Sequence, residues 1–294
     1  MKKVICCVLT FSFVLGFSHS LLAKSESVSK NTQKVRSYEK IDSKTEIKQE
    51  QEKEKKKYEK SYEKVDFRFS EKILEALTQF EKDHPKATED EINEYFLELC
   101  EIYNEDNKNI KNLTPSSDGD WDDFYDYADG VVTLNPKEQA LYDQSPSKGF
   151  KALMAGKGAW NYTELAFGRN DTDEESDAFR HALWNMWIVW AVNDSWAEKW
   201  TSAHEDGASY QNKKSLTYKM DMHNNEEGRY KAAQEGIDSD SSRSDVKIAI
   251  DELYKSGKLK KINKPNIKKE STWTLERFTG KEEDYVDQDL PPIT

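Results

Sequence analysis

Cysteine is scarce in this sequence: the 294 residues contain three, Cys6, Cys7 and Cys100. Cys6 and Cys7 lie in an apolar N-terminal run, and removal of that run leaves Cys100 as the single thiol. A chain with one cysteine has no internal disulfide, so its fold must be stabilised by core packing. Cys100 falls within a helical pattern of apolar residues, which favours a small buried core residue over a reactive thiol.

The N-terminal apolar run, Val4 to Leu15, is shorter than the roughly 20 residues that a membrane-spanning helix requires. It follows two lysines and leads into small residues that end at Ala23, which is the pattern of a secretory signal peptide. We therefore expect residues 1–23 to be a signal peptide cleaved after Ala23. The mature chain is then secreted or extracytoplasmic, bacterial, and without a transmembrane span.

Basic charge is in the minority, with 44 Lys and Arg residues against 56 Asp and Glu residues. The formal net charge is −12, and it becomes more negative once Lys2 and Lys3 leave with the signal peptide. Such a balance argues against broad electrostatic binding to nucleic-acid phosphates. It leaves room for a local basic site, so the unknown substrate could itself be anionic.

Glycine and proline are missing from residues 24–65, about half of which are charged. Such a segment buries too little apolar surface to fold alone, and we interpret it as a charged low-complexity spacer. The pattern then changes along the chain. It predicts a signal peptide (1–23), the spacer (24–65), a helical hairpin (66–110), an acidic aromatic linker (111–134), an all-α domain with a histidine cluster (135–256) and a C-terminal tail (257–294).

The fold class predicted for the main domain is all-α, because residues 135–256 show helical periodicity and no convincing alternating strand pattern. One helix, at about 174–192, is apolar on nearly every face and must therefore be surrounded by the others. The remaining helices are expected to start at Asn135-Pro136 and to cover about 146–167, 195–204, 218–234 and 244–255.

The five histidines are unevenly placed, and three of them, His181, His204 and His223, lie beside charged or amide residues. Histidine changes its charge near neutral pH and is the commonest metal ligand, so chemistry is expected here. On the central helix, Asp177 and Arg180 share a face with His181, because residues three and four apart are helical neighbours.

These residues could build two kinds of site. In an acid–base hydrolase, one imidazole acts as general base while an acid orients it and arginine or asparagine stabilises the developing anion. In a metal-assisted hydrolase, zinc is held by imidazoles and a carboxylate. The candidate catalytic residues are His181, His204, His223, Asp177 and Glu205; the candidate substrate-binding residues are Arg229, Asn224, Asn225 and Arg180; and the candidate zinc ligands are His181, His204, His223 and Asp221.

A second interpretation, from a different class, is a non-catalytic interaction domain on a charged stalk, with the His/Arg/Asp network holding the helices together. The two arginines are expected to differ. Arg180 adjoins an apolar helix and should be paired with Glu205 or Asp221, because an unpaired buried arginine is costly. Arg229, beside a glycine, is better placed to meet an anionic ligand.

Residues 134–235 also resemble a bacterial domain family of unknown function. The resemblance rests on Asp177-Ala-Phe-Arg-His-Ala-Leu-Trp-Asn185, on the pair His204-Glu205, and on Asp221-Met-His-Asn-Asn-Glu-Glu-Gly-Arg229. These strings fit the family motifs D-A-F-R-H-A-x-W-N, H-E and D-x-H-N-N-x-x-G-R. The resemblance implies an α-helical domain found in bacterial, often exported, proteins, and it implies no particular reaction.

Overall fold

The computed structural model describes residues 57–59, 61, 65–107, 127–128, 131–207, 213–281, 285–286 and 289–290. The expected signal peptide lies outside these residues, as do nearly all of the expected spacer and most of the linker. Everything described belongs to one compact unit within residues 43–294. In the described part of the chain no helix is both long enough and apolar enough to cross a membrane.

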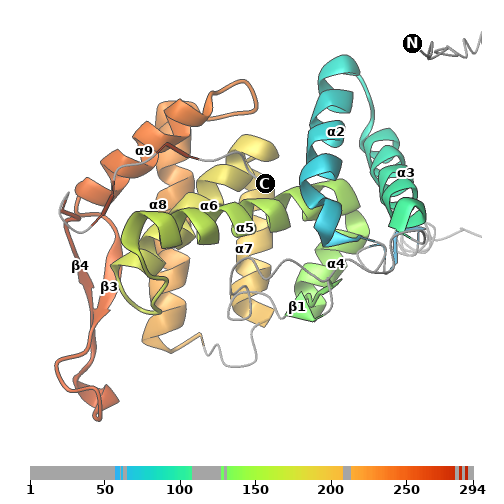
Figure 1. Ribbon diagram of the computed structural model, residues 1–294. Helices are drawn as coiled ribbons and strands as arrows, with labels where there is room; N and C mark the ends of the chain where they lie inside the picture. The colour runs from blue at the N-terminus through green and yellow to red at the C-terminus, as the bar shows by residue number, and fades with distance from the viewer. Residues whose placement is uncertain are drawn as a thin grey trace, which may run out of the picture. The chain divides into compact units, whose positions relative to one another are not determined.

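The fold is all-α, as predicted (Figure 1). Its helices are α2 (Ser70–Asp83), α3 (Glu89–Asn107), α4 (Pro136–Gln144), α5 (Pro146–Phe167), α6 (Glu175–Ala191), α7 (Asp194–Gly207), α8 (Leu216–Glu235) and α9 (Arg243–Lys255), with short 3₁₀ turns η2 (Phe67–Phe69) and η3 (Glu270–Thr272). Two antiparallel strand pairs accompany them: β1 (Tyr127–Ala128) with β2 (Val131–Val132), and β3 (Lys260–Asn263) with β4 (Thr274–Arg277).

Side-chain hydrogen bonds to the backbone stabilise the first turns of α4 and α6. Asn135 caps α4 through its side chain, and Glu138 reaches back to the Asn135 backbone, which completes a capping box. At α6 the cap residue Glu174 makes no side-chain cap bond. Instead Asp177, in the first turn, accepts a hydrogen bond from the backbone N–H of Asp173 at 2.7 Å. Asp177 therefore has two roles: it binds the backbone just before α6, and it is a candidate site residue.

Helix α6 is the centre of the fold. Every residue from Ser176 to Val189 is buried, and α5, α7, α8 and α9 pack around it. Trp184 and Trp187 are fully buried, and the indole N–H of Trp184 donates to the carbonyl oxygen of Ala152 on α5. Aromatic side chains of this size supply much of the apolar area that stabilises a core. The central position predicted for this helix is thus explained by its apolar faces.

Helices α6 and α8 approach each other closely at Gly228. A Cβ atom at this position would lie 2.3 Å from the carbonyl oxygen of Ala182, so glycine is needed for the contact. The two backbones therefore touch, and the polar side chains of α8 are brought directly against those of α6. This contact positions the candidate site.

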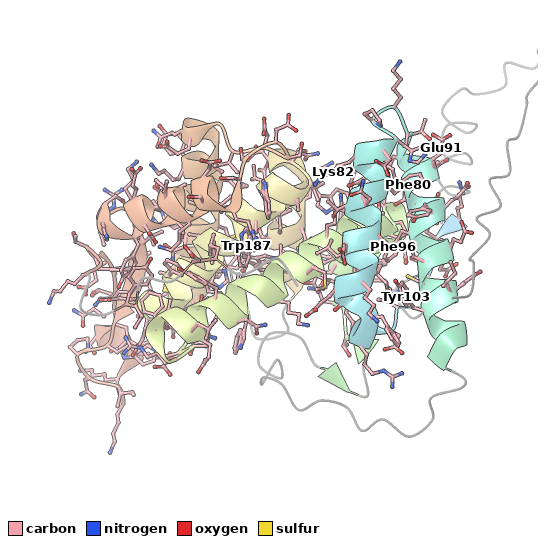
Figure 2. The ribbon with its side chains drawn as sticks, turned by 45° about the horizontal axis from the view of Figure 1, so that its top comes forward. Phe80, Lys82, Glu91, Phe96, Tyr103 and Trp187 are labelled. Carbon is pink, nitrogen blue, oxygen red and sulfur yellow. The ribbon has the colours of Figure 1, made fainter. Side chains whose placement is uncertain are left out.

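Helices α2 and α3 form an antiparallel pair whose aromatic side chains lie between them. Figure 2 shows Phe80, Phe96 and Tyr103 in this interface. The Phe96 ring also packs against the Phe150 ring of α5, with a centroid separation of 5.0 Å. Cys100 of α3 is buried, as its apolar surroundings in the sequence indicated.

The predicted C-terminal tail contains structure that the sequence pattern did not reveal. Strands β3 and β4 form a hairpin, and Ile262 in β3 and Phe278 directly after β4 are buried. Asn224 of α8 holds β3 at both ends of one residue, because its side chain accepts from the Lys260 N–H and donates to the Lys260 carbonyl, each at 2.9 Å. Four-residue strands give too short an alternation to be recognised, and β3 packs against both α8 and α6.

Candidate functional site

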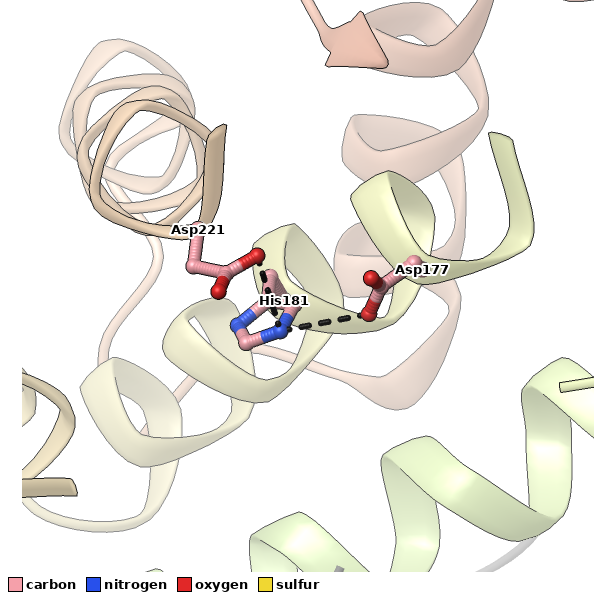
Figure 3. Close-up of side chains that lie close together, drawn as sticks. All are labelled: Asp177, His181 and Asp221. Carbon is pink, nitrogen blue, oxygen red and sulfur yellow. Dashed lines mark ion pairs between the residues drawn. The ribbon is translucent and has the colours of Figure 1, made fainter. Parts of the chain in front are cut away.

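Three buried side chains from α6 and α8 form the centre of the candidate site. The Nε2 atom of His181 lies 3.3 Å from Oδ1 of Asp177 and 3.5 Å from Oδ1 of Asp221 (Figure 3). Asp177 is one helical turn before His181 on α6, while Asp221 comes from α8 across the glycine contact. In the described part of the chain this is the cluster that could hold a metal ion, with ligand atoms within 4.8 Å of one another.

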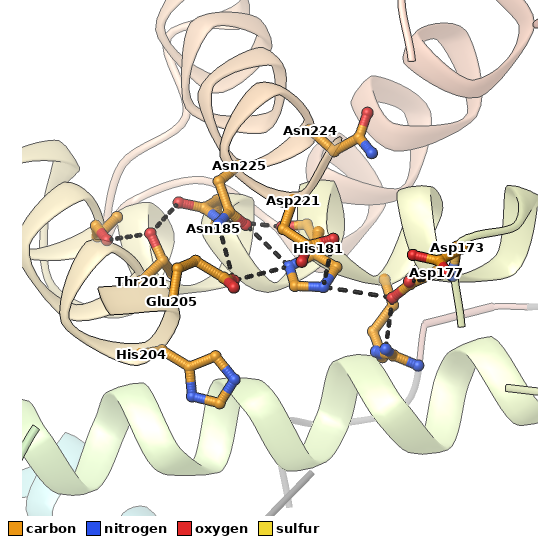
Figure 4. Close-up of polar contacts among 12 residues, drawn as sticks. Asp173, Asp177, His181, Asn185, Thr201, His204, Glu205, Asp221, Asn224 and Asn225 are labelled. Atoms are coloured by element: carbon orange, nitrogen blue, oxygen red, sulfur yellow. Dashed lines mark hydrogen bonds and ion pairs between the residues drawn. The ribbon is translucent and has the colours of Figure 1, made fainter. Parts of the chain in front are cut away.

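A chain of side-chain amides fixes the orientation of His181, and it starts at Arg229. A guanidinium only donates, so the atom that Arg229 Nη1 contacts at 3.0 Å must be the side-chain oxygen of Asn185. The Nδ2 of Asn185 then donates to the backbone carbonyl of His181 at 2.9 Å and to Oδ1 of Asn225 at 2.7 Å (Figure 4). The polarity of both amides is set by these obligatory donors and acceptors.

Asn225 transmits this polarity to the imidazole. Its Oδ1 lies 3.1 Å from Nδ1 of His181, and its Nδ2 donates to Oε1 of Glu205 at 3.3 Å. Since Oδ1 of Asn225 is an acceptor, Nδ1 of His181 must carry the hydrogen. The other ring nitrogen, Nε2, therefore faces the carboxylates of Asp177 and Asp221.

Arg180 pairs with a different acid from the two that were expected. Its Nη2 lies 2.5 Å from Oδ1 of Asp177, one turn earlier on the same helix, rather than binding Glu205 or Asp221. Its guanidinium also stacks over the Trp160 ring at 4.6 Å. The i,i+3 spacing makes this local pair available without any long-range contact, which explains the difference. Arg180 thus holds a candidate site acid in place.

Charge determines the protonation of this buried group. Burial alone would lower the pKa of His181, but the charges of Asp221, Asp177 and Glu205 raise that pKa to about 9. Burial alone would raise the pKa of Asp177, but the charge of Arg180 and the contact with His181 hold it well below its ordinary value. The isolated protein therefore carries an imidazolium among carboxylates at neutral pH.

His204 belongs to a second pair and not to the central cluster. Its Nδ1 lies 2.7 Å from Oε1 of Glu138, the buried acid that also caps α4, and its ring meets Trp184 edge to face at 5.0 Å. Burial would lower the pKa of His204, but Glu138 and then Glu205 raise it. Glu138 was not among the predicted site residues. Its burial needs a partner, but the sequence does not indicate which one.

His223 and Asn224 are placed on structural contacts. The Nε2 of His223 lies 2.9 Å from the backbone carbonyl of Lys258, and Asn224 holds Lys260 as described above. Residues two apart on a helix point in different directions, so His223 cannot join Asp221 at the cluster. Of the four predicted zinc ligands, His181 and Asp221 lie together, with Asp177 beside them, whereas His204 and His223 contact other residues.

Arg229 lies among acids of the protein itself. Burial lowers its pKa, while Glu198, Asp194 and Glu226 raise it, and Nε is 3.9 Å from Oδ1 of Asp194. The side chain is 13 % exposed. The anionic-ligand role expected for Arg229 therefore remains a prediction, whereas its bond to Asn185 is observed.

The comparisons with known proteins address most of the segment that contains these residues. Residues 139–258 match the family model of a domain of unknown function (DUF6973). The DUF6973 segment starts in α4 and ends before β3, and it holds the central cluster, His204 and the Arg229 amide chain. Neither a curated protein nor a solved structure matches the chain. The resemblance to an uncharacterised family is thereby confirmed, and the activity must be argued from the site.

Proposed function

We propose that Asp177, His181 and Asp221 bind a divalent ion of the zinc class and that the DUF6973 segment is a metal-assisted hydrolase of an exported bacterial protein. One observation carries the proposal. Because Nδ1 of His181 donates to Asn225, the lone pair of a neutral ring points from Nε2 toward two carboxylate oxygens. Only a cation between these atoms, or a proton on Nε2, makes that arrangement favourable.

The distances support a cation. Zinc bonds of about 2.0–2.1 Å in tetrahedral geometry place neighbouring ligand atoms about 3.3–3.4 Å apart. The separations of 3.3 Å and 3.5 Å from Nε2 to the two Oδ1 atoms lie close to this edge length. They are longer than the 2.7–2.9 Å of a charge-assisted hydrogen bond between nitrogen and a carboxylate. The fourth position of such a site would be filled by water or substrate.

The second sphere supports the same conclusion. Metal-bound histidine usually donates its other ring N–H to an oxygen that fixes its orientation. Here Asn225 accepts that hydrogen bond, and Glu205 lies 3.5 Å from the same Nδ1. The ligating carboxylate of Asp177 is itself held, by the Asp173 N–H and by Arg180.

Charge balance also favours an ion. The carboxylates of Asp177, Asp221 and Glu205 all lie within 3.5 Å of the His181 ring, and Arg180 pairs with Asp177. Buried charges are costly unless they are paired or bound to metal. A divalent ion brings two positive charges to this acidic group, whereas an imidazolium brings one.

The chemistry assigned to the chain is hydrolysis by an activated water. A bound zinc ion lowers the pKa of its water toward 7 and polarises the bond under attack. Asp177, His181 and Asp221 would hold the ion, while Asn225 orients the ring and Arg180 orients the acid. His204, kept in place by Glu138 and with a raised pKa, is assigned to donating a proton to the leaving group.

A non-catalytic role as an interaction domain is the second candidate, and burial is the observation that favours it. Asp177, His181 and Asp221 are each at most 5 % exposed, and each histidine of the DUF6973 segment has a protein partner. A network of this kind could serve only to lock α6 against α8. The two candidates differ in whether the cluster takes up a metal.

Metal content and metal-dependent stability test the proposal. We expect purified protein to contain about one zinc per chain, and chelator treatment to lower its melting temperature reversibly. Asp221→Asn should abolish both effects. Asp171→Asn, a matched change at an exposed acid, should preserve them. Protein that is free of metal and unaffected by added zinc or chelator would overturn the metal proposal. Hydrolysis of a panel of ester and phosphoester substrates, lost in His181→Gln, tests the activity.

A further inference from the structure

The strongest unexplained surface feature is a basic stretch in an acidic protein. Residues 255–269 contain seven lysines and no Asp or Glu, although the whole chain has a net charge of −12. Most of this stretch forms β3 and the connection that leads to β4. Lys261 and Lys264 are ion-paired with Glu175 and Asp173, while Lys268 and Lys269 are exposed at the end of the hairpin. Figure 1 shows this end extending away from the helices.

An apolar side chain is displayed among these lysines. Ile267 is 75 % exposed, the most exposed of the large hydrophobic side chains in the described residues. It stands between Asn266 and Lys268, directly before the two exposed lysines. Contacts to phosphate groups use cations and hydrogen-bond donors and do not involve an exposed aliphatic side chain. A membrane surface, by contrast, rewards a basic cluster and an inserted aliphatic side chain together.

The connection that carries Ile267 is well organised by local hydrogen bonds. The indole N–H of Trp273 donates to the carbonyl of Asn266 at 3.0 Å, and the Asn266 side chain accepts from the Lys268 N–H at 3.1 Å. The ammonium group of Lys264 lies 5.0 Å from the centre of the Trp273 ring. Because the turn is formed in advance, little conformational entropy is lost when it meets a surface. Tryptophan is also a residue that favours the interface between headgroups and hydrocarbon.

We propose that the β3–β4 hairpin binds the surface of an anionic lipid bilayer, with Ile267 entering the headgroup region and Lys268 and Lys269 meeting lipid phosphates. The inference is independent of the hydrolase proposal. It assigns a surface position to the DUF6973 segment, because Asn224 and Asp173 join the hairpin to α8 and to the start of α6.

The test is partitioning of the full chain onto vesicles in a sedimentation assay. Vesicles of phosphatidylcholine mixed with phosphatidylglycerol should bind the protein more tightly than vesicles of phosphatidylcholine alone. Lys268→Gln with Lys269→Gln should weaken that binding by about fivefold for each lysine, and Ile267→Ser by about tenfold or more. Salt at about 1 M, where the Debye length is about 3 Å, should remove the contribution of the lysines.

Matched variants separate the hairpin from total charge and hydrophobicity. Lys82→Gln with Lys86→Gln removes the same two charges from exposed positions near the turn between α2 and α3, and Ile248→Ser removes an exposed isoleucine from α9. Both should bind vesicles like the unchanged chain. The N-terminal apolar run is common to all variants, so its contribution cancels when variants are compared on the same vesicles.

Three results would overturn the inference. Equal partitioning of the hairpin and control variants would show that the hairpin does not bind the vesicles. Equal binding to neutral and anionic vesicles would show that the lysines do not contribute to binding. Binding to double-stranded DNA that is lost in the lysine variants, without binding to vesicles, would assign the surface to a soluble polyanion instead. A melting curve for each variant identifies any loss of vesicle binding that comes from unfolding. The Ile267→Ser variant tests the inference as long as it is folded.

Discussion

Arg229 donates a hydrogen bond of 3.0 Å to the side-chain oxygen of Asn185, and that bond sets the direction of the amide chain that ends at His181. Removing a group in the outer sphere of a metal site commonly costs 10–100-fold in affinity. We expect Arg229→Met to weaken zinc binding by about tenfold, while Thr201 still donates to Asn185 and limits the loss of stability to about 1–2 kcal/mol. Competition with a chromophoric chelator measures the affinity. An unchanged affinity would show that the amide chain does not orient the ring.

Arg180→Met should destabilise the protein strongly. The variant leaves Asp177 buried with its negative charge and without its guanidinium partner, a change that costs roughly 3–5 kcal/mol. Urea denaturation measures the loss. Arg169→Met is the control, because that arginine is half exposed and its carboxylates lie 3.6 Å away, so it should cost less than about 1 kcal/mol. Equal losses in the two variants would contradict the pairing.

The stability of metal-free protein should fall as the pH rises from about 6.5 to 9. The pKa of His181 is about 9 in the folded protein and near 6.5 in an unfolded chain. Its protonated form therefore stabilises the fold fully below pH 6.5, and this contribution, on the order of 3 kcal/mol, is lost as the pH passes 9. Urea denaturation in chelator at several pH values measures the fall. His84→Gln, at an exposed position, should retain the dependence, and a flat wild-type profile would contradict it.

Glu138→Gln should lower the pKa of His204 and spare the start of α4. Glutamine can still accept from the Asn135 N–H, so the capping box survives while the charge that raises the pKa of His204 is removed. Histidine resonances followed by NMR across pH report the change, and the pKa of His181 serves as the internal reference. If the pKa of His204 is the same in the wild-type protein and in the Glu138→Gln variant, Glu138 is not the cause of the raised pKa.

The positions of the helices could be predicted from the sequence because the residues that determine them are close together along the chain. Asn135-Pro136 and the apolar spacing place α4 and α6, and the neighbours Asp177 and His181 follow from helical geometry. The long-range pairings were not accessible in this way. The pair formed by His204 and Glu138 spans 66 residues, and one-dimensional spacing does not encode how helices that far apart meet.

The β3–β4 hairpin could not be predicted from the sequence either, because it too depends on a contact between distant residues. Asn224 lies 36 residues before Lys260, and its side-chain amide pairs with the backbone N–H and carbonyl of Lys260 in β3. An asparagine in a polar motif looks like a ligand-binding residue, and nothing local distinguishes it from one that holds backbone. The predicted roles of Asn224 and His223 were inferred from residue type, whereas their contacts are determined by the packing of α8.

The backbone contact between Gly228 and Ala182 has a consequence for ion choice. Helices that already touch cannot move closer, and the packed core around α6 resists their separation, so the spacing between Asp221 and His181 is nearly invariant. The number of ligands then limits which ion the cluster can bind. The cluster offers one imidazole nitrogen and two carboxylates, which suits the four-coordinate zinc proposed above, whereas calcium takes six to eight oxygen ligands. By fixing how α6 and α8 meet, the smallest side chain in the motif keeps this ligand set small.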